Sequence, residues 1–154
     1  MNVLAKNLEG KGLKVGIVLS RFNTEVGEGL LKACKDKLLA LGVADADITL
    51  ATVPGALETP VVLQTMANSE QFDALIALGA IIRGETYHFE IVAGESARGI
   101  MALTMDGISI GNGILTVENE AQALVRADPA QKDKGGEAAK AAIALLELKG
   151  QFGA

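Results

Sequence analysis

Four short apolar runs, spaced evenly along the chain, constrain the fold most strongly. They are "KVGIVLS" (14–20), "DITLATV" (47–53), "DALIALGAI" (73–81) and "ISIGNGIL" (108–115). Each is rich in Val, Ile, Leu and Ala, and none alternates clearly between apolar and polar residues. Runs of this kind are typical of strands that are covered on both faces, as in a parallel sheet. All four are too short to cross a bilayer.

Helical patterns separate these runs. Apolar residues recur every three or four positions after residue 24, which predicts a helix that Thr24 caps and Gly42 ends. Further helices are expected over 58–68, with Pro60 in the first turn, and over 86–104, about 118–127 and 135–149. The order β-α-β-α-β-α-β-α-α predicts a doubly wound fold, a flavodoxin-like three-layer α/β/α sandwich around a parallel four-stranded sheet.

Length and charge narrow the class of protein. A chain of 154 residues suits a single domain, which we expect to span residues 1–154. The net charge is −5 with no basic stripe, which argues against nucleic acid and membrane surfaces as partners. One cysteine and one histidine cannot form an internal disulfide or a Cys/His metal site. With no apolar signal core at the N-terminus, we expect a cytoplasmic protein.

Residues 1–10, "MNVLAKNLEG", form a further apolar patch with no neighbouring strand to pair with. Two interpretations remain open. The segment is either a frayed end or an extra N-terminal strand that is added to the sheet of a neighbouring subunit.

Ligands of open parallel sheets bind beyond the carboxyl ends of the strands, so the segments that follow each run are candidates. Phe22 either covers the core or stacks on a flat heterocycle. Glu58 either stabilises a helix dipole or accepts hydrogen bonds from ligand hydroxyls. Arg126 is either a favourable charge at a helix C-terminus or a phosphate clamp, and Lys134 is either a solvated loop charge or a second clamp.

The segment "RGETYH" (83–88) carries the most specific signal. Gly84 permits a tight turn, after which Glu85 and Thr86 are expected to present free amide hydrogens at a helix start, a site suited to an anion. His88 is a candidate for proton transfer, because imidazole is the side chain best suited to this task near neutral pH, although a lone histidine is more often structural. We interpret Cys34, on an apolar helix face, as an unreactive core residue.

Taken together, five segments resemble the lumazine synthase family. They are "RFN", "VPGALETP", "ALGAIIRGETYHFE", "NGILTVENEAQAL" with the arginine that follows, and "DKGGEAA", in order over about residues 13–145. The resemblance implies a transferase that makes 6,7-dimethyl-8-ribityllumazine, the penultimate step of riboflavin biosynthesis. It would join 5-amino-6-(D-ribitylamino)uracil to 3,4-dihydroxy-2-butanone 4-phosphate and release phosphate and water, without cofactor or metal.

The resemblance also implies a role for each matching residue. Glu85 and Thr86 would hold the phosphate, and His88 would donate and accept protons. Arg126 would pair with the phosphate from a neighbouring subunit, and Lys134 would lie near it. Phe22 would stack on the pyrimidine ring, and the backbone groups of Ala80, Ile81 and Ile82 would bond the uracil. The ribityl chain would be lined by Ala56, Leu57 and Glu58. Asn112 stands where many members have a phenylalanine that closes over the substrate ring.

The family assembles as pentamers, and in some members twelve pentamers close into an icosahedral shell, so we expect a homo-oligomer. The short "RADPAQKDKG" segment favours the shell, and riboflavin synthase is a candidate protein partner. Two alternatives remain. One is a non-catalytic riboflavin- or lumazine-binding shell protein of the same fold. The other is an FMN-binding flavodoxin-like protein. It is disfavoured because such a protein should have a Ser/Thr-rich phosphate loop after the first strand, and the segment 20–29 offers only Ser20 and Thr24.

Overall fold

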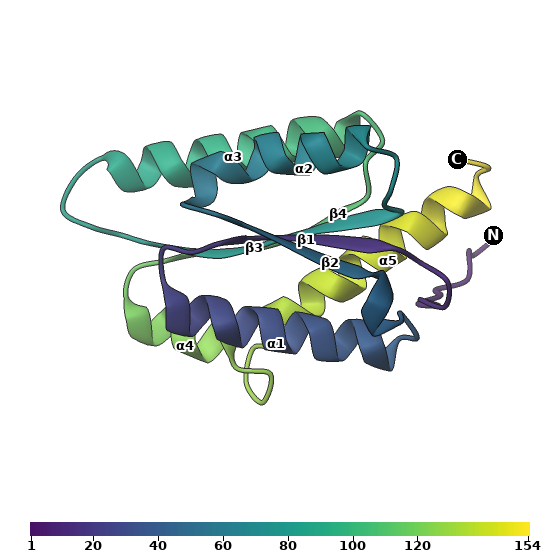
Figure 1. Ribbon diagram of the computed structural model, residues 1–154, viewed down its shortest axis with the longest axis horizontal. Helices are drawn as coiled ribbons and strands as arrows, with labels where there is room; N and C mark the ends of the chain where they lie inside the picture. Colours follow the sequence, from purple (N-terminus) through teal and green to yellow (C-terminus); the bar gives the residue numbers. More distant parts are fainter.

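A computed structural model describes all of residues 1–154 and shows a sheet between two layers of helices (Figure 1). The four strands run parallel in the order β2-β1-β3-β4. Their bounds are β1 Val15–Ser20, β2 Ile48–Val53, β3 Ala74–Ile82 and β4 Ile110–Val117. The predicted flavodoxin-like α/β/α sandwich is confirmed, with strand ends within two residues of those expected.

The helices divide between the two faces of the sheet. Helices α2 (Thr59–Asn68) and α3 (His88–Met105) cover one face, and α1 (Thr24–Ala40), α4 (Glu120–Ala127) and α5 (Lys134–Gln151) cover the other (Figure 1). Two short 3-10 helices, η1 (Asp45–Asp47) and η2 (Ala56–Glu58), flank β2.

Each face of the sheet has its own apolar core. On the α1, α4 and α5 side, Ile17 and Ile76 pack with Leu30 and Leu38 in a cluster of 20 buried residues. On the α2 and α3 side, a cluster of nine residues includes Val18 and Leu63. Successive strand residues point to opposite faces, so a strand that is buried on both faces must be apolar throughout. This explains the continuous apolar runs of the sequence.

Cys34 lies in the larger core and is fully buried. Burial raises the pKa of its thiol to about 12, and the nearby charge of Asp133 acts in the same direction. The thiolate is therefore scarce at neutral pH, which agrees with the unreactive role expected for this residue.

Two glycines let the backbone of α5 approach its neighbours closely. A Cβ atom at Gly111 in β4 would lie 1.9 Å from the carbonyl oxygen of Ala138, and one at Gly135 in α5 would lie 2.3 Å from that of Leu30. Side chains at either position would displace backbone rather than side-chain atoms. Helix α5 is therefore locked against both β4 and α1.

The helix ends lie within two residues of the sequence predictions, and three of the differences concern residues named above. Asn23, not Thr24, caps α1, because its extended backbone directs Oδ1 to the amide of Val26 (3.1 Å). Helix α3 begins at His88, two residues later than predicted. Lys134 was considered as a loop charge but is the first residue of α5, which Asp133 caps. The expected end of α1 is confirmed, since Gly42 follows it with a φ of +104°.

The first ten residues form no strand within the chain. Gly10 donates a hydrogen bond to the carbonyl of Leu41 (2.8 Å), and Gln151 donates to the carbonyl of Ala5 (3.0 Å). None of the helices is both long enough and apolar enough to cross a membrane.

Candidate active site

The sheet opens between β1 and β3 at its carboxyl end. The ladder between these strands stops at Leu19 and Leu78, whereas the ladder between β3 and β4 continues to Ile82 and Val117. The last residues of β3 therefore have a strand partner on one side only. Such a divergence of neighbouring strands is where doubly wound sheets bind ligands.

Backbone groups of β3 alternate in direction, and this decides which of them face the opening. The amide of Arg83 donates to the carbonyl of Val117 (2.9 Å), so Arg83 faces β4. By alternation Ile81 also faces β4, whereas Ala80 and Ile82 face the side of β1. The two peptide groups that lack a strand partner thus belong to Ala80 and Ile82. The third residue of the expected set, Ile81, does not face the opening, because its backbone pairs with β4.

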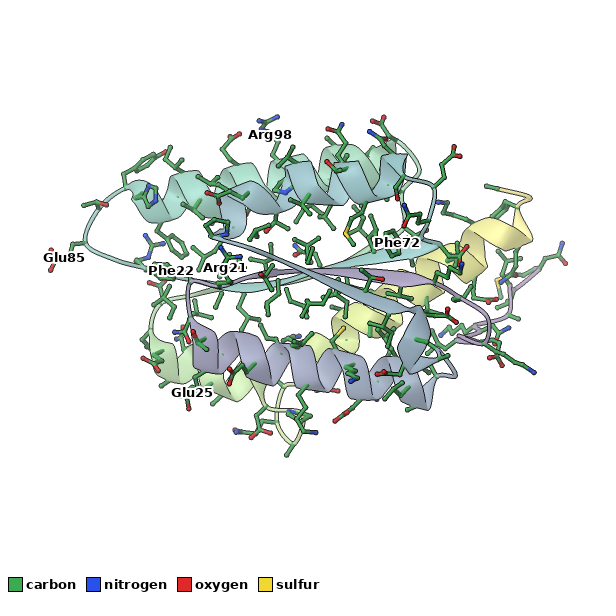
Figure 2. All side chains as sticks on the ribbon, viewed as in Figure 1. Arg21, Phe22, Glu25, Phe72, Glu85 and Arg98 are labelled. Carbon is green, nitrogen blue, oxygen red and sulfur yellow. The ribbon has the colours of Figure 1, made fainter.

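The segment after β1 places an aromatic ring at the edge of this opening. Phe22 is 76% exposed, so it does not cover the core of the chain, which was one of the two interpretations. Arg21 beside it donates to the hydroxyl of Thr52 at the end of β2 (2.9 Å). Both side chains lie at the end of the sheet from which the loop with Glu85 projects, whereas Phe72 lies at the opposite end (Figure 2).

The segment after β2 turns through η2 into α2. The amide of Glu58 donates to the carbonyl of Gly55 (3.2 Å), and its carboxylate lies 3.3 Å from the point that a Cβ of Gly55 would occupy. Glycine at position 55 therefore leaves room for the carboxylate above the turn. Ala56 is buried, and Leu57 is exposed beside it. Pro60 occupies the first turn of α2, as predicted.

The segment after β3 is an exposed loop, residues 83–87, that leads into α3. The hydroxyl of Thr86 accepts a hydrogen bond from the amide of His88 (3.3 Å), so Thr86 helps to close the first turn. His88 is exposed and is the first residue of α3, whereas a helix start at residue 86 would have made it the third. Glu85 lies at the tip of the loop (Figure 2).

Arg83 anchors the base of this loop, a role that the sequence analysis missed. Its Nε donates to Glu118 (2.7 Å), its terminal nitrogen pairs with Glu90, and its guanidinium lies 4.2 Å from the ring centroid of Phe89. The hydrogen bond that Arg83 donates to Glu90 lowers the pKa of the Glu90 carboxyl and raises the pKa of Arg83. No local pattern could reveal this, since Glu118 is 35 residues away.

The remaining predicted residues lie elsewhere in the chain. Arg126 is in the last turn of α4 and donates to the carbonyl of Gln122 (3.0 Å), and Lys134 pairs with Glu137 (2.9 Å). Both belong to the layer opposite His88. Asn112 is exposed in the middle of β4, opposite Ala77. No hydrogen bond or ion pair joins these three residues to the loop of His88 in one chain.

Comparisons with known proteins identify the group to which this arrangement belongs. The family model described as 6,7-dimethyl-8-ribityllumazine synthase matches residues 12–150. A protein of that name from Methylobacillus flagellatus is 59% identical over 153 residues, which cover 99% of this chain and 100% of the relative. Another from Novosphingobium aromaticivorans is 63% identical over 133 residues, 86% of this chain and 94% of the relative. The chain belongs to the 6,7-dimethyl-8-ribityllumazine synthase family.

Proposed function

We propose that the chain catalyses the reaction of this family on the rim formed by its strand ends. It would condense 5-amino-6-(D-ribitylamino)uracil with 3,4-dihydroxy-2-butanone 4-phosphate, by Schiff base formation, loss of phosphate and ring closure with loss of water. The observation that carries the proposal is the match over residues 12–150, together with the loops that surround the opening between β1 and β3.

The pyrimidine would lie in that opening. Phe22 is exposed beside it and would stack on the flat ring. The backbone groups of Ala80 and Ile82, which face the opening, would bond the uracil edge, with Ile81 buried between them. Backbone groups suit this task because their positions are fixed by the sheet.

The ribityl chain would lie along the turn before α2. Ala56 and Leu57 would line it, and the carboxylate of Glu58 would accept hydrogen bonds from its hydroxyls. The support for this placement is the position of that carboxylate above Gly55, on the side of β2 that adjoins the opening.

The phosphate would bind at the start of α3. Glu85 and Thr86 would hold it through backbone amides and the threonine hydroxyl, aided by the positive end of the helix dipole. His88 would pass protons during elimination and ring closure. Its exposure at the first turn of α3 leaves both ring nitrogens accessible to substrate.

The site would be completed by a neighbouring subunit. Arg126, Lys134 and Asn112 lie away from the loop of His88, so they would serve the site of the next copy, with Arg126 on its phosphate. We propose a pentamer of these single-domain chains, with residues 1–10 added as a strand to a neighbour, and a larger shell as a further assembly. Light scattering should give five protomers or a multiple of five, and a mass near 15.9 kDa would contradict the shared site.

The reaction is tested by mixing the two substrates with purified protein and recording the absorbance of the lumazine chromophore. The rate must exceed that of the spontaneous condensation in matched buffer. A protein that binds riboflavin or lumazine and leaves the rate unchanged would instead be a non-catalytic binding protein of the same fold.

A mixing experiment tests whether the site is shared between subunits. His88→Ala and Arg126→Ala chains are unfolded together in equal amounts and reassembled. In a ring, about one site in four then combines an intact His88 with an intact Arg126 of the neighbour. At a butanone phosphate concentration far below KM, where Arg126→Ala alone is about tenfold impaired, the mixture should show about a quarter of the native activity. If both residues served the same chain's site, the mixture would show only the average of the two variants.

A further inference from the structure

The loop that carries His88 has few attachments of its own. Residues 83–88 are all exposed, and nothing lies within 4 Å of the point that a Cβ of Gly84 would occupy. The loop's internal hydrogen bond is the one between Thr86 and His88, at 3.3 Å. A group that transfers protons must be held close to its productive geometry, so something else must restrain this loop.

Arg83 supplies the restraint from one end of the loop to the other. Its own amide and its Nε are both fixed to the end of β4, at the carbonyl of Val117 (2.9 Å) and the carboxylate of Glu118 (2.7 Å). The rest of its guanidinium contacts Phe89 and Glu90, the two residues that follow His88 in α3. The strand end and the first helical turn are thus joined across the loop by one side chain.

The shape of the guanidinium explains why an arginine is suited to this position. Its planar fork can donate in two directions to separate carboxylates while its face stacks on an aromatic ring. A lysine offers one compact charge and cannot make all three contacts together. Exposed ion pairs add little stability, so these contacts are better explained by geometry than by stability.

We propose that Arg83 is a positioning residue, which holds the loop of residues 84–88 in place and so orients His88 and the anion-binding start of α3. The inference rests on the proposed function of that loop. The Nε and one terminal nitrogen of Arg83 are engaged by Glu118 and Glu90, so its role would be to hold the loop rather than to bind a substrate.

The test compares Arg83 with a second arginine that also forms an ion pair at the surface. Arg98 on α3 forms an ion pair with Glu95 (2.5 Å) away from the loop, so Arg98→Ala removes the same charge and is the matched control. We expect Arg83→Ala to lower kcat roughly 10- to 100-fold, the scale of a misplaced catalytic group, and to raise KM for the butanone phosphate but not for the pyrimidine. Arg83→Lys should recover little of the loss. Arg98→Ala should leave all three constants unchanged.

Combining Arg83→Ala with His88→Ala in one chain separates an effect on the position of His88 from an effect on stability. If Arg83 acts through His88, then Arg83→Ala should no longer reduce kcat in a chain that already carries His88→Ala. Equal kinetics for the Arg83→Ala and Arg98→Ala chains, or a full kcat loss that persists in the His88→Ala background, would overturn the proposal. If His88→Ala itself had no effect, the proposed role of His88 would fail instead, so the two failures are distinguishable.

Discussion

The two helical layers are attached to the same sheet in different ways. Helix α5 packs backbone against backbone, at Gly111 on β4 and at Gly135 against α1, where not even a methyl group would fit. Helices α2 and α3 pack through side chains and leave Val61, Met101 and Met105 exposed on their outer surface. The first layer fixes the fold, whereas the second carries His88 at one exposed end. Substitutions in the two layers should therefore have separable effects on stability and on catalysis.

The largest separation is expected at His88. His88→Ala should slow turnover roughly 10²- to 10⁴-fold, the usual contribution of general acid–base catalysis, because the loop has no other imidazole to transfer protons. Since the ring is exposed, the thermal midpoint should barely change. The measurements are the steady-state rate at saturating substrates and the thermal melting curve, each for the native chain and for the variant. Equal turnover in the variant would remove His88 from the mechanism.

The opposite result is expected at Gly111. A side chain there overlaps the backbone of α5, so Gly111→Val should destabilise the fold by roughly 3 kcal/mol or more. Gly94 on α3 is the matched control, because nothing lies within 4 Å of its Cβ position. Gly94→Ala should stabilise by up to about 1 kcal/mol through helix propensity. The two variants are compared by urea unfolding. Equal midpoint concentrations of urea for Gly111→Val and Gly94→Ala would contradict the difference between the layers.

A substitution at Arg126 tests whether the layer of α1, α4 and α5 also serves catalysis. Arg126→Ala should raise KM for the butanone phosphate roughly tenfold, the effect of losing one charge-assisted contact, with little change for the pyrimidine. Arg126→Lys should not restore it fully. If Arg126 is only a favourable charge at the end of α4, the variant should instead lose about 0.3–1 kcal/mol of stability and affect both substrates equally. A rise for the pyrimidine alone would exclude the phosphate contact.

The smallest effect is expected on stability, at Cys34 in α1. Its pKa in the folded chain is about 12, against 9.0 when unperturbed, so the folded state holds the proton more tightly. This contribution to stability is complete below pH 9 and is lost as the pH rises from about 9 to about 12. At pH 10 the loss is on the order of 1 kcal/mol. The difference in unfolding free energy between the native chain and Cys34→Ala should shrink accordingly from pH 8 to pH 10, and a constant difference would contradict it.

The sequence predicts what depends on periodicity and fails where contacts are distant. Continuous apolar runs and repeats of three or four residues revealed every strand and long helix, since each signal lies within one segment. Helix starts were less predictable, because Asn23 and Thr24 are both good caps and only the local backbone decides between them. The direction of the β3 peptide groups and the contacts of Arg83 required the register of the sheet, which no single segment contains.

The hydrogen bond between Gln151 and Ala5 brings the two ends of the chain together, at the end of the sheet away from the loop of Glu85 (Figure 1). Neighbouring ends of this kind tolerate circular permutation. A short linker could join them, and the chain could be reopened in the exposed turn at residues 69–71, where Glu70 adopts a φ of +57° that a chain end would relieve. Every strand, every helix and the loops at the carboxyl end of the sheet would remain continuous. The order of the segments along the chain would change, while their arrangement in space would stay the same.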